Sequence, residues 1–260
     1  MPSRFSVAIF VCSSTNTVDV FNQVIPAFNR MWPDCPYPKF VGLNPPFSDD
    51  QEVNGFRAII SPQSGWRDEL KAQIQKIESE FDHVILILDD FLVRSQVDSP
   101  ALEALVKEAV QNQLPYLRLT PLRFSILAKG IDTLFLGLQI IRKIPSKTPY
   151  YSSLQIAVWN TKHLLSMLGF VGNIWQFEHQ KIANKIHWAV VGKGPIDYRH
   201  MVEKGKWIPQ APKLFAKLEL PFFVGSRGMW PTWVGIKLEL DRIKFGIIGY
   251  SWVRFKSLFL

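Results

Sequence analysis

The stretch that most constrains the fold is a run of five aliphatic residues, Val84 to Leu88, followed by two adjacent carboxylates, Asp89 and Asp90. A short apolar run of this kind indicates a strand buried on both faces of a parallel sheet. In open α/β sheets, ligands bind at the edge where such strands end. Paired aspartates there suit a divalent cation and the phosphates it neutralises, because hard cations prefer oxygen ligands. A solvated turn is the alternative interpretation, since Asp is also common in turns.

The residues around this stretch predict alternating strands and helices. Such alternation is typical of an α/β fold whose sheet is mostly parallel. Apolar residues spaced three and four positions apart indicate the helices, and short apolar runs indicate the strands. The expected strands are 5–12, 39–44, 56–60, 84–88, 114–121 and 186–191, and the expected helices are 18–31, 66–81 and 101–113.

Beyond residue 122 the pattern is less regular, and residues 124–144 receive no assignment. A helix is expected to begin at Tyr150–Gln155, where Ser152-x-x-Gln155 matches a capping box. A ligand-binding role is the alternative for Gln155. A short helix is also expected from Tyr198 to Trp207.

Length and composition place the chain among globular proteins. Its 260 residues, 47% of them hydrophobic, are near the upper size of one domain with a C-terminal extension. No apolar run reaches the ~18 residues of a spanning helix, so we expect a soluble or peripheral protein. Two cysteines supply neither a disulfide framework nor a metal site, which fits a reducing cytoplasm.

The net charge of +8 belongs to the C-terminal part of the chain. Residues 1–180 carry 16 Lys/Arg and 17 Asp/Glu, whereas residues 181–260 carry 14 and 5. We therefore expect a main domain over 1–213 and a basic, aromatic extension over 214–260. Such a segment suits an anionic membrane surface, and a solvated basic face is the alternative. Nucleic acid is not expected as a partner, because no recognition motif is present.

Several common catalytic motifs are absent from the sequence. It lacks the phosphate loop G-x-x-x-x-G-K-[ST], the dinucleotide motif G-x-G-x-x-G, the nucleophile elbow G-x-S-x-G and the zinc motif H-E-x-x-H. The five histidines lack the close pairing of a zinc site, so we expect them to be structural or exposed. Polar residues after the first strand, from Ser13 to Asn16, would either cap the next helix or hold a nucleotide.

Three short motifs, taken in order along the chain, carry a family resemblance. They are Leu88-Asp89-Asp90-Phe91, Tyr151-x-x-Leu154-Gln155-x-x-x-Trp159 and Trp175-x-Phe177-Glu178. Together they resemble the GT-A glycosyltransferases, and more closely the bacterial enzymes that build capsular and surface polysaccharides. The resemblance covers roughly residues 5–210. It implies a GT-A-like (Rossmann-like) α/β fold, with a mostly parallel sheet flanked by helices.

The resemblance also implies roles for individual residues. Asp90 would hold Mn²⁺ or Mg²⁺ against the diphosphate of a nucleotide sugar, and Asp89 would face a ribose or a backbone N–H. The family's D-x-D spacing is absent, and neighbouring side chains of a strand point to opposite faces, so one aspartate is expected to be the ligand. Weak or absent metal dependence stays open. Nucleotide-sugar contacts are expected from Ser13, Ser14, Asn44, Trp66 and Asp89, and acceptor contacts from Tyr151, Gln155, Trp159 and Trp175.

Glu178 is the expected catalytic base. Attack on an anomeric carbon needs a group that takes the acceptor's proton, and a carboxylate against aromatic rings suits that task. Displacement by this route would invert the anomeric configuration. A surface or ion-paired glutamate is the alternative.

The expected function is transfer of a sugar from a nucleoside diphosphate sugar to a glycan acceptor, often lipid-linked in such pathways. The protein would work in the cytoplasm, at the inner face of the cell membrane. A non-catalytic carbohydrate-binding or scaffold protein of an assembly complex is the alternative.

Overall fold

The computed structural model describes residues 6–121, 133–136, 139–145, 150–169, 172–180, 185–237 and 240. Residues 238–239 and 241–260 of the expected extension lie outside this part of the chain. No helix within the described ranges is long and apolar enough to cross a membrane.

The N-terminal half alternates strands with helices, as predicted. Its elements are β1 (Val7–Cys12), α1 (Val18–Met31), β2 (Lys39–Leu43), β3 (Glu52–Val53), β4 (Phe56–Ile60), α2 (Trp66–Ile77), β5 (His83–Leu88), β6 (Phe91–Val93), α3 (Ser99–Gln111) and β7 (Tyr116–Arg118).

The C-terminal half has shorter elements. They are β8 (Thr133–Leu136), β9 (Gln139–Lys143), β10 (Ala157–Asn160), α4 (Thr161–Leu168), α5 (Ile174–His179), β11 (His187–Val190), β12 (Tyr198–His200), β13 (Val202–Glu203), β14 (Lys206–Trp207), α6 (Ala211–Lys217) and the 3₁₀ turn η1 (Gly225–Arg227).

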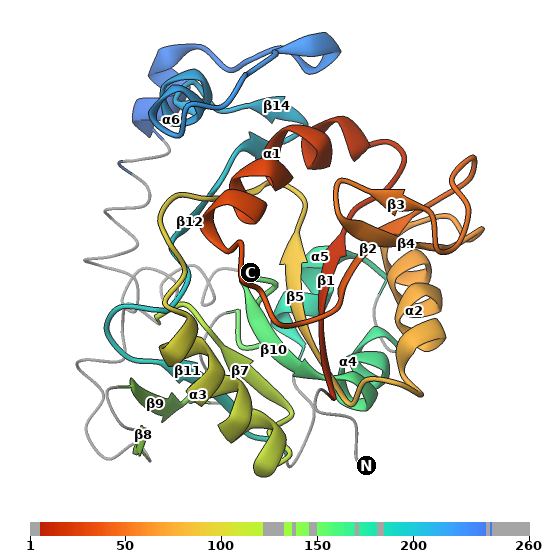
Figure 1. The fold of residues 1–260 in the computed structure, drawn as a ribbon, viewed down its shortest axis with the longest axis vertical. Coiled ribbons are helices and arrows are strands. Elements are labelled where there is room, and N and C mark those ends of the chain that lie inside the picture. Colours follow the sequence, from red (N-terminus) through yellow and green to blue (C-terminus); the bar gives the residue numbers. More distant parts are fainter. Residues whose placement is uncertain are drawn as a thin grey trace, which may run out of the picture.

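A ten-stranded sheet forms the centre of the molecule, in the order β3-β4-β2-β1-β5-β10-β7-β11-β9-β8. Strands β4, β2, β1 and β5 run parallel to one another. Strand β10 runs antiparallel between β5 and β7, and β11 is again parallel to β7. Helices flank the sheet (Figure 1). The predicted α/β class, with a mostly parallel sheet flanked by helices, is therefore confirmed, and a reversed strand lies in the middle of the sheet.

Two cores lie on opposite faces of this sheet, because side chains alternate along each strand. On one face, Val7, Ile9 and Val11 of β1 join the cluster that contains the apolar residues of α1 and α3. On the other face, Ala8 and Phe10 join the cluster of α2, α4 and α5. The continuous apolar runs of β1 and β5 are thus explained by burial on both faces.

A third core joins the C-terminal segment to the outer side of α1. It includes Val20 and Val24 of α1, Trp207 of β14 and Phe215 of α6, all nearly or fully buried. The domain boundary expected after residue 213 falls inside α6. Residues on both sides of that position therefore pack against α1.

The prediction of a helix that begins at Tyr150–Gln155 is wrong. Residues 150–156 contain no helix, and Trp159 lies in β10, where it is fully buried. Strand β10 is paired on both sides, with β5 and with β7, so tertiary pairing decides its conformation. The helix begins only at Thr161, where Asn160 is the N-cap and its side chain accepts from the His163 backbone N–H at 3.1 Å.

The short helix expected from Tyr198 to Trp207 is also wrong. Strand β12 pairs with β6, with His200 opposite Phe91. Strands β13 and β14 then form a hairpin whose turn residues, Lys204 and Gly205, have φ of 49° and 79°. Two positive φ angles in succession are typical of a tight hairpin turn.

Candidate functional site

Polar side chains gather at one edge of the sheet, where its parallel strands end. Cys12, the last residue of β1, is in register with Gly42 of β2 and with Leu88 of β5. The residues that follow these strands therefore share that edge. The edge brings together Ser13, Ser14, Asn44 and Asp89, four of the residues expected to contact a nucleotide sugar.

The loop between β1 and α1 is held to the end of β5 by Ser13. Its hydroxyl donates to Oδ2 of Asp89 at 2.8 Å, and the Thr17 side chain also hydrogen-bonds that carboxyl. Ser14 donates its backbone N–H to Oγ1 of Thr17 at 3.1 Å, which closes the loop at the start of α1. Two hydroxyls, those of Ser13 and Thr17, thus contact one carboxyl group at the start of a helix.

Asn44 connects two neighbouring loops at the same edge. Its Oδ1 accepts from the backbone N–H of Thr15 at 3.3 Å, and its Nδ2 donates to the carbonyl of Ser61 at 3.1 Å. The side chain therefore fixes the position of the β1–α1 loop relative to the end of β4.

The carboxyl group of Asp89 is held in an unfavourable environment for charge. Burial raises its pKa to about 7, and the neighbouring charge of Asp90 adds to the rise. Hydrogen bonds from Thr17 and Ser13 and the charge of Arg227 oppose it. Strongly raised pKa values of this kind are concentrated at functional sites.

Asp90 turns to a different part of the molecule. Its Oδ2 lies 3.5 Å from Nδ1 of His200 and accepts weakly from the Val202 backbone N–H at 3.4 Å. Its side chain is 15% exposed. The two adjacent carboxylates thus contact different elements, Asp89 the β1–α1 loop and Asp90 the end of β12 and the start of β13.

A chain of polar contacts continues from His200. Its Nε2 lies 3.2 Å from Nε2 of Gln155, and Oε1 of Gln155 accepts from the hydroxyl of Tyr198. With Nε2 of His200 accepting from that amide nitrogen, the N–H at Nδ1 of the ring faces Asp90. His200 was not predicted, because a helix was expected over this stretch. The alternation of Tyr198 and His200 is also typical of a strand, but it does not report the pairing with β6 that brings His200 to Asp90.

Glu178 lies in α5, which begins with a complete capping box formed by Asn173 and Gln176. Its Oε1 accepts from the backbone N–H of Leu154 at 2.9 Å and from the hydroxyl of Ser153 at 3.2 Å. The carboxylate therefore holds the loop that leads into β10, close in sequence to Gln155. Trp175 lies in the same short helix.

The remaining aromatic residues of the expected site pack inside the protein. Trp159 is fully buried, with its ring centroid 4.4 Å from that of Tyr116. Tyr151 is 4% exposed and stacks on His187 at 4.3 Å. Trp66 begins α2, and its ring centroid lies 5.4 Å from that of Phe177. The ring faces of Trp159 and Tyr151 are covered by protein, so neither ring is open to stack on an acceptor.

Three other histidines, His83, His163 and His187, do not lie at this edge. His163 and His187 are buried, and their Nε2 atoms lie 2.9 Å apart in a hydrogen bond. His83 is fully buried at the start of β5, at the opposite end of the strand from Asp89. These three are structural, as expected from the sequence.

The cation implied by the family resemblance can be tested against these donors. In the described ranges, no three His, Cys, Asp or Glu side chains are grouped to hold a metal ion. Mg²⁺, however, is usually held by one or two carboxylates together with substrate phosphates. Asp89 and Asp90 supply that number, and the pKa of Asp89 is raised first by burial and then by the charge of Asp90, an effect that a bound cation would offset. The donor set fits a cation whose other ligands are phosphates and waters.

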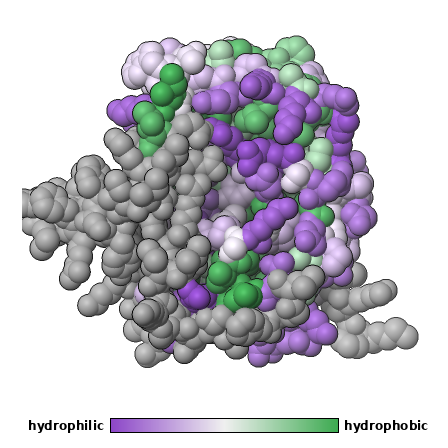
Figure 2. Space-filling model, turned by 90° about the vertical axis from the view of Figure 1, so that its left-hand side faces the viewer, coloured by the Kyte–Doolittle hydropathy of each residue, from purple (hydrophilic) through white to green (hydrophobic). Residues whose placement is uncertain are grey.

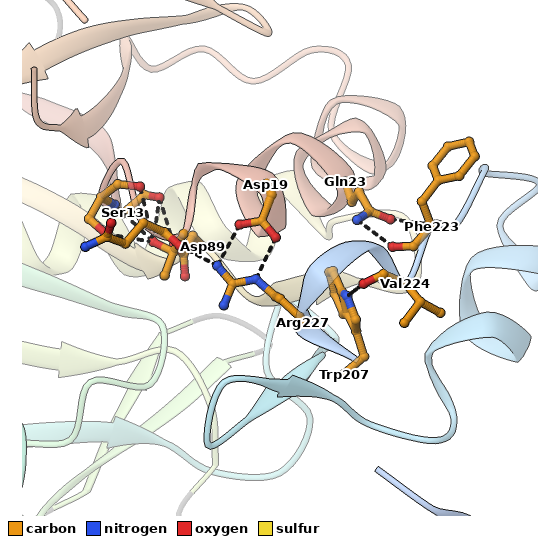
Figure 3. A network of polar contacts seen from close by, with 11 residues as sticks. Ser13, Asp19, Gln23, Asp89, Trp207, Phe223, Val224 and Arg227 are labelled. Carbon is orange, nitrogen blue, oxygen red and sulfur yellow. Dashed lines mark hydrogen bonds and ion pairs between the residues drawn. The ribbon is translucent and has the colours of Figure 1, made fainter. Parts of the chain in front are cut away.

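Arg227 reaches this edge from the C-terminal segment (Figure 3). Its guanidinium forms two hydrogen bonds of 2.6 Å with Asp19 in the first turn of α1, and one of 2.5 Å with the carbonyl of Asn16. Its charge also acts on Asp89. A positively charged side chain from a distant part of the sequence therefore lies at this edge.

No protein-family model and no curated protein sequence matches this chain. Among solved structures, a cytidylyltransferase from Leptospira borgpetersenii serovar Hardjo-bovis is 10% identical, with 68% of this chain and 69% of that chain covered and a TM-score of 0.36. The galactosyltransferase LgtC, in complex with donor and acceptor sugar analogs, is 13% identical, with coverages of 66% and 68% and a TM-score of 0.39. TarS of S. aureus is 10% identical, with coverages of 85% and 41% and a TM-score of 0.42. With TM-scores below 0.5, these similarities do not decide what the protein does.

Proposed function

We propose that this chain is a glycosyltransferase that moves a sugar from a nucleoside diphosphate sugar to a glycan acceptor in surface-polysaccharide assembly. The observation that carries the proposal is the Asp89-Asp90 pair at the carboxyl edge of the sheet. Asp89 there contacts the hydroxyl of Ser13, and the guanidinium of Arg227 lies close by. Ligands of open α/β sheets bind at such an edge. Hydroxyls suit a ribose or sugar, and cations suit a diphosphate.

The proposed donor side is formed by residues of the sheet edge. Asp90, supported by Asp89, would hold Mn²⁺ or Mg²⁺, which when bound neutralises the charge of the diphosphate. His200, whose Nδ1 lies 3.5 Å from Oδ2 of Asp90, would orient that carboxylate. The nucleoside and its sugar would contact Ser13, Ser14, Asn44 and Trp66.

The proposed acceptor side lies toward α5, with Gln155 and Trp175 as contacts and Glu178 as base. The acceptor oxygen forms a bond to the anomeric carbon while the bond from that carbon to the diphosphate oxygen breaks. The acceptor's proton passes to Glu178, and the bonding electron pair leaves with the diphosphate. Attack from the face opposite the leaving group inverts the anomeric configuration.

Release of nucleoside diphosphate from a panel of donors, with Mn²⁺ and glycan acceptors present, tests this proposal. The enzyme should release one nucleoside diphosphate, and Asp90→Asn should abolish the release while the circular dichroism spectrum stays unchanged. A scaffold protein would release none with any donor. Equal rates in the wild type and in Asp90→Asn would contradict the site assignment.

We also propose that the C-terminal segment contacts an anionic membrane surface, which would bring the site to lipid-linked acceptors. Large exposed hydrophobic side chains in the described ranges are concentrated there: Phe223, Val224, Met229, Trp233, Ile236 and Leu240, with Ile186 elsewhere. Exposed lysines at positions 204, 206, 213, 217 and 237 accompany them. The face in Figure 2 is largely hydrophilic, and its hydrophobic side chains lie in separate groups. Aromatic and cationic side chains together suit a headgroup layer.

Co-sedimentation with vesicles tests the membrane contact. Binding should require an anionic lipid such as phosphatidylglycerol, and the double variant Trp233→Ser/Ile236→Ser should reduce it at least about 10-fold. Ile186→Ser is the matched control, because Ile186 is 41% exposed but lies outside the segment. Equal loss in both variants, or equal binding to neutral vesicles, would contradict the proposal.

The two unpaired cysteines are consistent with a place on the cytoplasmic side.

A further inference from the structure

The segment that carries Arg227 is anchored along α1 by contacts that do not involve Arg227. Gln23 of α1 exchanges two hydrogen bonds with the backbone of Phe223, at 2.9 and 2.8 Å (Figure 3). Trp207 donates from Nε1 to the carbonyl of Val224 at 3.0 Å. At the other end of α1, Arg30 bonds the carbonyl of Leu218. The backbone around η1 is therefore fixed without the Arg227 side chain.

The side chain of Arg227 is directed into the site rather than into solvent. It is 14% exposed, whereas Arg30, which joins the same helix to the same segment, is 46% exposed. Its guanidinium contacts the loop that also carries Ser13, through the carbonyl of Asn16. A largely covered arginine at the edge of a carboxylate pair is costly unless it is paired, and Asp19 supplies the pairing.

The contact between Arg227 and Asp19 has the geometry that arginine uses for phosphates. Both Nε and Nη2 donate to the two carboxylate oxygens, in a parallel fork. Carboxylates and phosphates accept this fork in the same way. Asp19 itself is half exposed, so it can turn to water when another anion takes its place.

We propose that Arg227 is a diphosphate-binding residue, and that Asp19 is its partner until the diphosphate of the donor replaces it. The inference rests on the proposed function for the identity of the donor, although the anion itself defines the contact. The ligand is the diphosphate group itself, whether it belongs to a nucleotide sugar or is free pyrophosphate. Asp19 competes with that ligand, so it lowers the affinity.

Calorimetric titration with inorganic pyrophosphate, in the presence of Mg²⁺, tests the contact. Arg227→Ala should weaken binding about 10- to 100-fold, since a hydrogen bond to a charged group is worth about 1.5–3 kcal/mol. Arg227→Lys should retain part of the affinity as a point charge without the fork. Asp19→Asn should tighten binding, because the competing carboxylate loses its charge. Arg30→Ala is the matched control and should leave the affinity unchanged.

The direction in which Asp19→Asn changes the affinity distinguishes anion binding by Arg227 from a purely structural role of the Arg227–Asp19 pair. If the pair only holds the segment on α1, Asp19→Asn and Arg227→Ala weaken binding together, and the proposal is overturned. Unchanged affinity in Arg227→Ala, or no binding of pyrophosphate by the wild type, also overturns it. Pyrophosphate binding that depends on Arg227, in a protein that releases no nucleoside diphosphate from any donor, supports this contact while the proposed transferase function fails.

Discussion

The hydroxyl of Ser13 donates a 2.8 Å hydrogen bond to Oδ2 of Asp89, although the two residues are 76 positions apart in the chain. The bond joins the end of β1 to the end of β5 at the carboxyl edge of the sheet. It is one of few favourable contacts for a carboxyl whose pKa is raised to about 7 by burial and by Asp90. The fold alone therefore disfavours the ionised form of Asp89.

A first prediction concerns Asp89→Asn and pH. The folded pKa of Asp89 lies above its ordinary value of 3.8, so between about pH 4 and 7 the folded state retains a proton that the unfolded state has released. Stability from this group is present at low pH and is lost as pH rises through about 7, by at most about 1.4 kcal/mol per pH unit. The free energy of unfolding of Asp89→Asn, minus that of the wild type, should grow over this range. Parallel pH profiles from urea unfolding would contradict this.

A second prediction concerns the buried pair His163 and His187. Burial lowers the pKa of both rings, and each lies below the ordinary value of 6.5. The unfolded state therefore binds more protons in mild acid, so stability is present above about pH 6.5 and falls below it. In the Asp89→Asn background, unfolding between pH 5 and 7.5 should show this slope. Replacing His163 with Gln, which keeps a hydrogen-bonding group but does not titrate, should reduce it. An unchanged slope would exclude the pair as its source.

A third prediction concerns the packing of α2 on β2. A Cβ at Gly42 would lie 2.2 Å from Oε1 of Gln73, whose Nε2 donates to the carbonyl of Leu43 at 3.0 Å. Gly42→Ala should therefore cost about 1–3 kcal/mol, because the buried amide has to move. Gln73→Ala should cost about 1 kcal/mol or more, because it removes a buried hydrogen bond to that carbonyl, which then accepts only from the Ser61 backbone N–H. The double variant should be less destabilised than the sum of the two, and additive effects would contradict the contact.

A fourth prediction concerns Glu178, for which the structure shows a second task. Gln at position 178 retains an oxygen for the Leu154 N–H and the Ser153 hydroxyl, so Glu178→Gln should fold normally. It cannot take a proton, and transfer should fall about 100- to 10,000-fold. Glu178→Ala should lose both the transfer and some thermal stability. Transfer by Glu178→Gln at the wild-type rate would assign Glu178 to loop support alone.

Sequence alone predicted the elements whose own residues determine their structure. The aliphatic runs of β1 and β5 need burial on both faces, and the apolar stripe of α1 needs one buried face, so their patterns were decisive. Strand β10 could not be predicted in this way. Trp159 and its neighbours have a spacing that also fits a helix, and pairing with β5 and β7 made the choice.

The residues of the candidate site also fall into two groups, those that local sequence patterns predict and those that they do not. Ser13, Asn44 and Asp89 follow predicted parallel strands, so their meeting at one edge could be foreseen. His200 and Arg227 could not, because each reaches the edge through long-range packing. Arg227 lies 208 positions from Asp19 and arrives only because the C-terminal segment packs along α1. Local patterns do not report such contacts.

The most direct test of the central claim is calorimetric titration of the protein with nucleoside diphosphate sugars in the presence of Mn²⁺. The account predicts that one donor binds the wild type, and that Asp90→Asn weakens its binding at least about 10-fold while the protein remains folded. A wild-type protein that binds none of the donors, or an Asp90→Asn variant that binds as tightly as the wild type, would contradict the assignment of a nucleotide-sugar site to the Asp89-Asp90 edge.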